Sequence, residues 1–464
     1  MTRSPNILFL VPDQMRFDLI AMHGVSALQL PNIKSLFDDS VVFEKAWCAQ
    51  SLCTPARGSL VTGLYPHQHG ATANGIPLPD DSKALPELLG AEDYTTGYIG
   101  KWHLGNEQSA QHGFEFWLST EPYQQREHDS PGSERVISSY CKYLTSIGYK
   151  PDMGRAFSRE YQAQLPLEHT KPAFQTRSCI DFIRRNESKP WLCFLSTLEP
   201  HPPFVGVSTS WYSPEDVVLP ENFAVAPSDS TPQYIRAKYK QLQKYGFKGF
   251  DLRSERGWRS LIAAYWGLNS LVDAALGNVI RYLKEAGQYD NTIIVFTADH
   301  GAMMSSHGLA AKDVQYEEAA RVPLAIKPVG NGHRQIFSKK VSHVDVLPTI
   351  LGMLGAPSYV NLPGRDLSKF LSTDKDCVEA PIVIERNSTL PNPLGLPVRT
   401  LIDEDDWKLN ASGYGELELY NLNEDPLELR DRSSDLDCRG RALEMFGKLR
   451  EWQIAQNDPV AISI

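Results

Sequence analysis

The chain has 464 residues, of which 42% are hydrophobic and 22% charged, and its formal net charge is −10. This composition is typical of a globular protein and excludes disordered and fibrous classes. The negative charge repels nucleic acid and anionic lipid, so neither is expected as a partner, and an anionic substrate would need a local pocket of positive charge.

The N-terminal residues and the cysteines indicate the cellular compartment of the protein. No apolar run approaches the length of a membrane span. After Met1 the chain enters an apolar segment directly, without a signal peptide, so the sequence as written predicts a cytoplasmic protein; a trimmed leader would make it periplasmic or secreted. The seven cysteines are scattered, with no Cys-x-x-Cys pair, which favours reduced thiols.

Three short apolar runs, at 6–12, 191–197 and 291–297, predict buried strands. Runs that are apolar on both faces are typical of parallel strands covered by helices. Residues 259–285 carry apolar side chains at helical spacing. Alternating strands and helices predict an α/β fold, with a large mixed, mostly parallel sheet sandwiched by helices.

Polar residues follow each of these runs: Asp13, His201 and Asp299. Ligands of open α/β sheets bind beyond the carboxyl ends of the strands. We therefore expect these side chains to lie near a common site. Two polar, proline-containing segments, 130–135 and 205–234, read as surface insertions that shape a substrate pocket.

The pattern of predicted secondary structure changes towards the C-terminus. A chain of this length exceeds one hydrophobic core, so a second, smaller unit is expected. We predict a catalytic domain over 1–379 and an α+β subdomain over 380–464. The subdomain would contain short strands and a helix, at 398–410, 416–422 and 442–454.

The most specific motif is Cys53-Thr54-Pro55-Ala56-Arg57, followed by Thr62-Gly63. Alone, a cysteine beside a turn proline is usually an ordinary buried residue. This motif, however, resembles the Cys-x-Pro-x-Arg signature of the sulfatases, in the alkaline phosphatase superfamily. The resemblance implies that a formylglycine-generating enzyme converts Cys53 to formylglycine.

Later segments resemble the same family, in the same order. Lys101 and His103 lie in Gly-Lys-Trp-His-Leu-Gly, and on an extended segment side chains two apart point the same way. His201 lies in His-Pro-Pro, and Lys312 follows the block that begins Thr-Ala-Asp299-His-Gly. The resemblance covers most of the chain except about 120–175 and 205–250, where we expect substrate specificity to be determined.

The resemblance implies a divalent cation held with the modified Cys53 by Asp13, Gln14, Asp299 and His300. Many sulfatases have a second aspartate where this chain has Gln14, and asparagine where it has His300. Ca²⁺ is the first expectation on family grounds, and Mn²⁺ is the alternative because it accepts mixed oxygen and nitrogen ligands.

The resemblance also implies roles for the other motif residues. Arg57 would steady the hydrated aldehyde. Lys101, His201 and Lys312 would bind the substrate and neutralise charge on the sulfuryl oxygens. His201 is a candidate acid for the leaving alcohol, and His103 is a candidate base that releases sulfate.

The resulting prediction is a sulfuric ester hydrolase that acts on a sulfated saccharide or another small sulfate ester. The alternative is a phosphonate monoester or phosphodiester hydrolase with the same nucleophile, because Gln14 and His300 also occur in that branch; His300 occurs in iduronate-2-sulfatase-like enzymes too. A catalytically silent binding protein on this fold is disfavoured, because every catalytic position that can be matched is present. The sequence does not indicate the oligomeric state.

Overall fold

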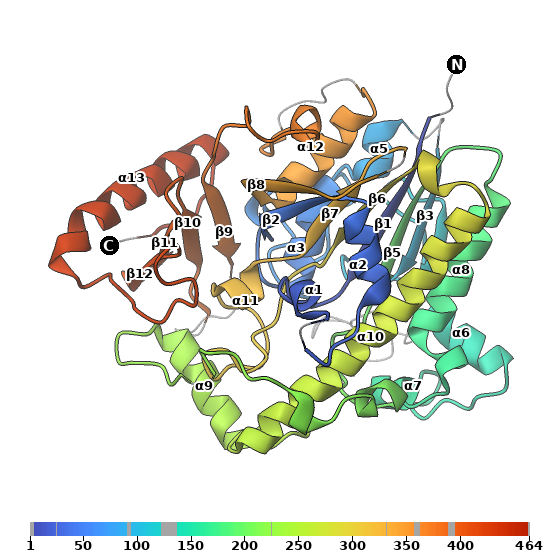
Figure 1. Ribbon diagram of the computed structural model, residues 1–464, viewed down its shortest axis with the longest axis horizontal. Helices are drawn as coiled ribbons and strands as arrows, with labels where there is room; N and C mark the ends of the chain where they lie inside the picture. The colour runs from blue at the N-terminus through green and yellow to red at the C-terminus, as the bar shows by residue number, and fades with distance from the viewer. Residues whose placement is uncertain are drawn as a thin grey trace.

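The computed structural model describes residues 4–24, 26–90, 94–121, 137–223, 225–330, 332–356, 362–387 and 395–462. Figure 1 shows a large sheet covered by helices and a smaller sheet on the C-terminal side. Within the described ranges, no helix is both long enough and apolar enough to cross a membrane.

The large sheet has eight strands. In spatial order they are β4 (Phe116–Ser119), β3 (Thr95–Gly100), β5 (Trp191–Thr197), β1 (Asn6–Pro12), β6 (Thr292–Thr297), β7 (Leu324–Lys327), β2 (Val41–Trp47) and β8 (Gln335–Ser342). Only β7 runs antiparallel to its neighbours among these strands. The predicted mixed, mostly parallel sheet is thus confirmed.

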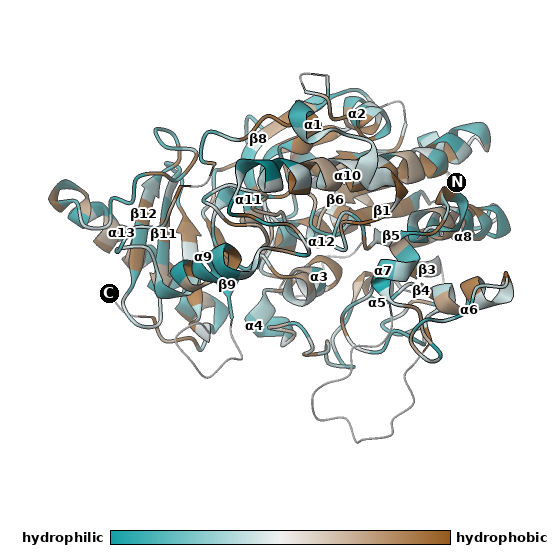
Figure 2. Cartoon of the chain, turned by 90° about the horizontal axis from the view of Figure 1, so that it is seen from below, coloured by the Kyte–Doolittle hydropathy of each residue, from teal (hydrophilic) through white to brown (hydrophobic). Residues whose placement is uncertain are grey.

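Helices cover both faces of this sheet. One face carries α2 (Pro31–Asp38), α8 (Lys171–Arg185) and α10 (Glu255–Glu285), and the other carries α3 (Cys53–Thr62), α5 (Leu85–Leu89) and α12 (His343–Met353). Figure 2 shows α2 and α10 on one side of the strands and α3 on the other. Successive residues of β1 enter opposite cores, Leu8 with the first set of helices and Phe9 with the second, which explains why this strand is apolar on both faces.

The remaining helices are shorter or peripheral. They are α1 (Leu19–Met22), α4 (Pro66–His69), α6 (Ser139–Ser146), α7 (Arg159–Ala163), α9 (Gln233–Tyr245), α11 (Glu317–Ala320) and α13 (Arg439–Gln456). Single 3-10 turns occur at η1 (Leu167–His169), η2 (Val207–Ser210), η3 (Pro214–Asp216), η4 (Tyr289–Asn291), η5 (Ser368–Phe370) and η7 (Leu436–Cys438). The predicted insertion at 205–234 contains η2 and η3, which pack against α10; the one at 130–135 lies outside the described residues.

The C-terminal sheet is antiparallel. Its order is β12 (Leu417–Asn421), β11 (Trp407–Ser412), β10 (Val398–Ile402) and β9 (Ile382–Arg386). The single strand expected at 398–410 is divided into β10 and β11, because the chain reverses at Asp406, which has a φ of 63°. Helix α13 packs on this sheet, which confirms the predicted combination of a small antiparallel sheet and a helix. The division at residue 379 stays a prediction.

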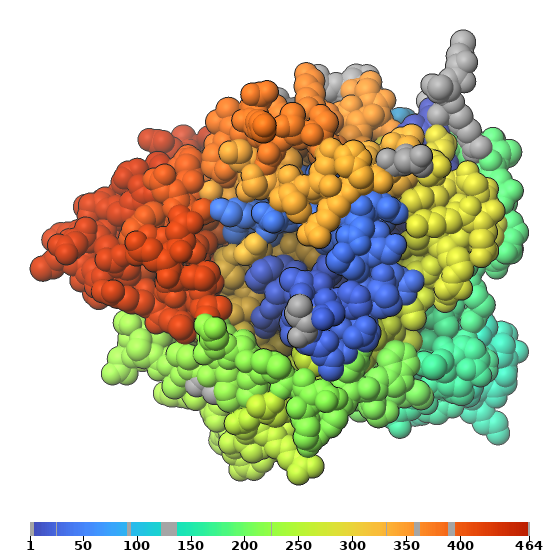
Figure 3. All heavy atoms as spheres, viewed as in Figure 1, coloured from blue at the N-terminus to red at the C-terminus, as the bar shows by residue number. Residues whose placement is uncertain are grey.

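Figure 3 shows the C-terminal residues, in red, forming one continuous surface with the rest of the molecule, and the green segment that contains α9 lies against them. The backbone N–H of Gln233, at the start of α9, donates to Glu416 beside β12 at 3.0 Å. The carboxyl ends of β1, β5 and β6 lie towards this segment, so the polar residues that follow those strands gather between the main body and its insertions.

Candidate active site

Four side chains from three parts of the chain meet at the carboxyl edge of the large sheet. Asp13 follows β1, Asp299 and His300 follow β6, and Cys53 begins α3. One ligand atom from each lies within 4.8 Å of the others, and all four residues are buried. The structure thus brings together four of the five residues expected at a metal site, and Gln14 follows Asp13 directly.

Arg57 lies one helical turn after Cys53 and ties the two carboxylates together. Its Nη2 donates to Asp13 Oδ2 and its Nε to Asp299 Oδ2, both at 3.0 Å. Its Nη1 donates to the Lys101 carbonyl and to Ser196 Oγ, each at 2.7 Å. Burial opposes the charge on Arg57, but Asp299 and Asp13 raise its pKa above the ordinary value. The guanidinium therefore fixes the acidic ligands, a role that the sequence did not indicate.

The two aspartates have different electrostatic surroundings. Burial favours protonation of both, but Lys101 and Lys312 hold the pKa of Asp13 well below its usual range. Lys101 Nζ lies 2.5 Å from Asp13 Oδ2. Burial, together with the charge of Asp13, raises the pKa of Asp299 to about 6. Asp13 is therefore the firmly charged member of the pair.

The donor atoms suit a divalent cation. His300 Nδ1 donates to the Gly301 carbonyl at 2.8 Å, which turns Nε2 towards the cluster, 3.3 Å from Cys53 Sγ. Asp299 raises the pKa of His300 against its burial, and Nε2 would bind a cation in the deprotonated ring. Asp299 Oδ1 is oriented by the backbone N–H groups of Gln14 and His300, each at 2.9 Å. Two carboxylates, an amide and an imidazole form a mixed oxygen and nitrogen set that could hold a divalent cation. The oxygen ligands suit either Ca²⁺ or Mn²⁺, whereas the imidazole nitrogen suits Mn²⁺ better.

Gln14 is shaped to face this cluster. Its backbone has a φ of 68°, an uncommon conformation for a non-glycine residue. Its Oε1 accepts from Lys312 Nζ at 2.8 Å, and its buried Nε2 has no hydrogen-bond partner among the described residues. The amide oxygen thus shares the ammonium group of Lys312 with Cys53, and the unpartnered Nε2 leaves room for a change of amide orientation on ligand binding.

Two lysines flank Cys53. Lys312 Nζ lies 3.1 Å from Cys53 Sγ, and Lys101 follows β3. Burial and Asp13 act to raise the pKa of the Cys53 thiol, but Lys101, Lys312 and His300 hold it well below its usual range. The site therefore stabilises negative charge at position 53.

The reasoning that placed His103 beside Lys101 is wrong, although the two residues do share the site. Strand β3 ends at Gly100, and His103 has a φ of 60°, so the segment is a turn and not an extended strand. The backbone N–H of His103 donates to Glu107 at 2.7 Å and fixes this turn. Burial raises the pKa of Glu107 to about 8, and nothing in the sequence marked this residue.

His103 is held as a neutral imidazole. The Thr54 hydroxyl donates to the His103 carbonyl at 2.8 Å, so at 3.1 Å it accepts from His103 Nδ1–H. The proton is therefore on Nδ1, and Nε2 is an acceptor. Burial and Lys101 lower the pKa of His103, which keeps the ring neutral near pH 7.

His201 lies beyond β5 and is also neutral. Its Nδ1 donates to the Pro202 carbonyl at 2.8 Å, which leaves the lone pair on Nε2. Burial and Lys312 hold the pKa of His201 well below its usual range. Before substrate binds, His201 therefore has no proton on Nε2 to give to a leaving group.

Comparisons with known proteins agree with this geometry. The family model described as Sulfatase matches residues 5–356. The multifunctional alkaline phosphatase superfamily protein PehA of Trinickia caryophylli is 29% identical over 421 residues, which are 81% of this chain and 78% of the relative. The N-acetylglucosamine-6-O-sulfatase of Bacteroides thetaiotaomicron is 24% identical over 522 residues, 99% of this chain and 88% of the relative.

Solved structures show the same fold. A phosphonate monoester hydrolase from Silicibacter pomeroyi superposes with a TM-score of 0.81 at 23% identity, covering 98% of this chain and 96% of the other. A protein in complex with its substrate D-glucosamine-2-N,6-O-disulfate superposes with a TM-score of 0.75 at 20% identity, covering 98% and 99%.

Proposed function

The chain belongs to the sulfatase family of sulfuric ester hydrolases, and we propose that it cleaves sulfate monoesters of saccharides with a formylglycine made from Cys53. One observation carries the proposal: Cys53 is grouped with Asp13, Asp299 and His300 and lies 3.1 Å from the ammonium group of Lys312. This arrangement supports the proposal, because a nucleophile at position 53, a cation held by these ligands and positive charge for an anionic ester would meet at one point.

The groups that the family adds would supply the nucleophile. Hydrated formylglycine offers a hydroxyl group, and a divalent cation lowers the pKa of a hydroxyl that it holds. Asp13, Gln14, Asp299 and His300 would hold the cation, with Ca²⁺ expected and Mn²⁺ the alternative. Arg57 keeps both carboxylates in place, because it donates to each of them.

The remaining residues would neutralise the charge of the sulfuryl group and transfer protons during the reaction. Lys101 and Lys312 lie where negative charge grows on the sulfuryl oxygens, and preorganised charge of this kind is commonly the largest catalytic contribution. His103 is neutral with an acceptor at Nε2, which suits a base that takes a hydroxyl proton and so promotes sulfate release. A bound sulfate ester would raise the pKa of His201, so that His201 gains a proton and donates it to the leaving alcohol.

Saccharide substrates are supported by the relatives. One is named an N-acetylglucosamine-6-O-sulfatase, and another an ulvan-active sulfatase. We propose further that a formylglycine-generating enzyme is the maturation partner, since the Cys53 motif has the form that such an enzyme reads in this family.

A phosphonate monoester hydrolase is the second candidate. Gln14 and His300 favour it, because an Asp-Gln pair and an Asp-His pair at these positions also occur in that branch of the family. Two similar structures are named phosphonate monoester hydrolases. Both candidates use the same nucleophile, so substrate preference separates them.

The deciding experiment uses protein that is co-expressed with a maturation enzyme and shown by mass spectrometry to contain formylglycine. We expect a higher kcat/KM for 4-nitrophenyl sulfate than for a 4-nitrophenyl phosphonate monoester. Cys53→Ala should abolish turnover, while Cys438→Ala, a buried cysteine of the C-terminal subdomain, should not. A phosphonate preference would establish the second candidate, and full activity in Cys53→Ala would refute the assigned nucleophile.

A further inference from the structure

An ion-pair cluster lies beside the site, in the part of the chain where no family motif was found. Arg159, the first residue of α7, donates to Glu121 Oε2 from Nε at 2.7 Å, and its Nη2 lies 2.5 Å from the same oxygen. Lys171, at the start of α8, binds the other oxygen of Glu121. Two cations thus share one carboxylate.

The charges of this cluster do not cancel. Burial alone would raise the pKa of Glu121, but Lys171 and Arg159 lower it to about 2, so the carboxylate is ionised. Lys171 and Glu121 are both almost fully buried and neutralise each other. Glu199, which lies nearby, has its pKa raised by burial, which weakens its charge. Lys171 alone neutralises Glu121, so Arg159 gives the cluster a net positive charge.

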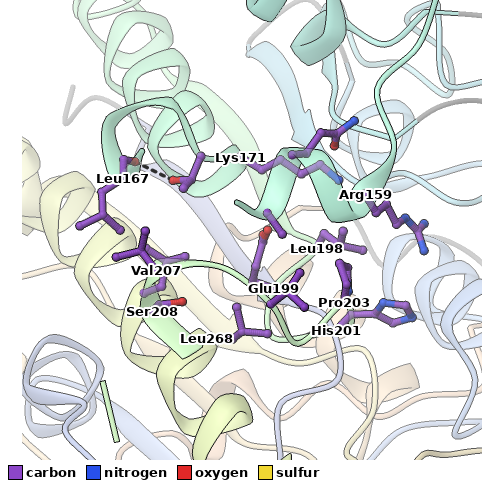
Figure 4. A pocket seen from close by; sticks show the side chains of 15 residues that line it. Arg159, Leu167, Lys171, Leu198, Glu199, His201, Pro203, Val207, Ser208 and Leu268 are labelled. Carbon is purple, nitrogen blue, oxygen red and sulfur yellow. Dashed lines mark hydrogen bonds between the residues drawn. The ribbon is translucent and has the colours of Figure 1, made fainter. Parts of the chain in front are cut away.

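Arg159 lies near enough to the catalytic site to interact electrostatically with Asp13 and Cys53. It also lines a small neighbouring pocket with His201, Lys171 and Glu199. Figure 4 shows the side chains of Arg159 and His201 extending towards the same side of this pocket. The Arg159 side chain is 29% exposed, and within the described part of the chain it contacts Glu121 through Nε and Nη2. Glu121 raises the pKa of Arg159, and Asp13 and Cys53 add to this, as expected for a group near the reaction centre.

We propose that Arg159 binds a second oxyanion of the substrate, either a carboxylate or another sulfate on the same saccharide. The inference rests on the proposed function and adds a specificity-determining residue to it. A guanidinium has two edges that donate paired hydrogen bonds, and Glu121 occupies only one of them. Glu121 and Lys171 orient Arg159, so that the edge of the guanidinium that Glu121 does not occupy can bind the part of the substrate beyond the sulfate ester.

The test compares matched ligands that differ by one anionic group. One pair is N-acetylglucosamine 6-sulfate and glucosamine 2-N,6-O-disulfate, and the other is glucose 2-sulfate and glucuronic acid 2-sulfate. Each is measured as a competitive inhibitor of 4-nitrophenyl sulfate hydrolysis by the formylglycine-containing enzyme, so that turnover of the saccharide is not required. The first pair tests a second sulfate and the second pair tests a carboxylate.

We expect wild type to bind the doubly charged member of at least one pair about tenfold or more tightly, as for a charge-assisted hydrogen bond. Arg159→Met should bring that ratio close to one and change kcat/KM for 4-nitrophenyl sulfate less than about threefold. Arg159→Lys should keep part of the preference, because it retains the charge without the second edge. Arg177→Met, which removes an exposed arginine of α8, is the matched control and should behave as wild type.

Three results would overturn the inference: no preference for either doubly charged ligand in wild type, an unchanged preference in Arg159→Met, or an equal loss for all ligands and for 4-nitrophenyl sulfate. The last result would mean that Arg159 only supports the fold. If wild type does not hydrolyse 4-nitrophenyl sulfate at all, the proposed function fails first, and this outcome is distinct from the other three.

Discussion

At the scale of single residues, the site depends on side chains that do several things at once. Arg57 uses three nitrogens to bind two carboxylates, a carbonyl and a hydroxyl. Lysine could not replace it, because a single ammonium group cannot span those positions. Lys312 similarly contacts both Gln14 and Cys53, so it links the expected cation site to the nucleophile.

Lys312→Ala should lower kcat/KM for 4-nitrophenyl sulfate about 100-fold or more, because it removes positive charge from the position where negative charge develops. Steady-state kinetics on formylglycine-containing protein measures this. Lys240→Ala is the control, since Lys240 is an exposed lysine of α9; we expect a change of less than about threefold. A wild-type rate in Lys312→Ala would remove this residue from the reaction.

His69 should make the free energy of unfolding depend on pH. Its Nδ1 accepts from the Ala71 N–H at 3.1 Å, so the ring is neutral, and burial lowers its pKa from 6.5 to about 4. The unfolded chain therefore takes up the proton first as the pH falls, and stability is lost between about pH 6.5 and pH 4. Between pH 7.5 and 5.5 this loss is about 1 kcal/mol.

Urea unfolding at those two pH values measures the effect. We expect the decrease in the free energy of unfolding to be about 1 kcal/mol smaller in His69→Gln than in wild type. His333→Gln changes an exposed histidine and should follow wild type. An identical pH dependence in His69→Gln and wild type would contradict the prediction.

At the scale of elements, α3 is held in place by close packing against α4. Gly58 lies one turn after Thr54, and a Cβ at this position would come within 2.4 Å of the His69 ring. The helix that carries Cys53 and Arg57 thus approaches its neighbour more closely than any other residue would allow. A glycine inside a helix ordinarily weakens it, so its presence here has a packing reason.

Gly58→Ala should destabilise the protein by about 1–3 kcal/mol, because overpacking outweighs the better helix propensity of alanine. It should also lower kcat, since displacing α3 moves Cys53. Gly447→Ala is the matched control: Gly447 lies in α13 with nothing within 4 Å of an added Cβ, and we expect about 0.5–1 kcal/mol of stabilisation. Denaturant unfolding measures the change in the free energy of unfolding for each variant. Equal changes in Gly58→Ala and Gly447→Ala would refute the packing argument.

The elements also show what the sequence could predict. Strands β1, β5 and β6 are buried at every position, so their apolar runs stood out from the sequence. Strand β7 has four residues and runs antiparallel, and its place between β6 and β2 is set by tertiary packing that no local pattern encodes. The motif residues were predicted from family resemblance. Glu107 and Glu121 belong to no motif themselves, and their contacts depend on how the chain folds back around them.

At the scale of the whole molecule, the C-terminal sheet braces the segment that carries Lys312. Lys408 of β11 binds Glu317 of α11 at 2.9 Å and Glu428 at 2.7 Å, and all three are buried. The pKa of Glu317 is lowered chiefly by Lys408 against its burial, while burial raises that of Glu428 to about 8. Arg386 of β9 also binds Asp313, the residue after Lys312, at 3.1 Å. The small sheet is therefore joined to the catalytic site by buried charges.

Lys408→Met should destabilise the protein by about 3 kcal/mol or more, because it removes the ammonium group that neutralises the buried Glu317 carboxylate at 2.9 Å and leaves Arg321, at 3.9 Å, as its cationic partner. It should also reduce activity, since Glu317 lies five residues after Lys312. Lys448→Ala removes a partly exposed partner of Glu404 and should cost less than about 1 kcal/mol. Urea unfolding followed by tryptophan fluorescence tests this, and a stability equal to wild type in Lys408→Met would show that the buried pairs do not join the two parts.

Cys53 is only 1% exposed in the folded protein, at the first position of a helix that packs under the sheet edge. A second enzyme has no access to a thiol buried to that degree. The proposed conversion must therefore take place on the nascent or newly released chain, before it folds. Each protein molecule would then gain or miss the conversion of Cys53 during its synthesis and would keep that state after folding. The fraction of active enzyme in a preparation would therefore depend on the expression host more than on any treatment of the purified protein.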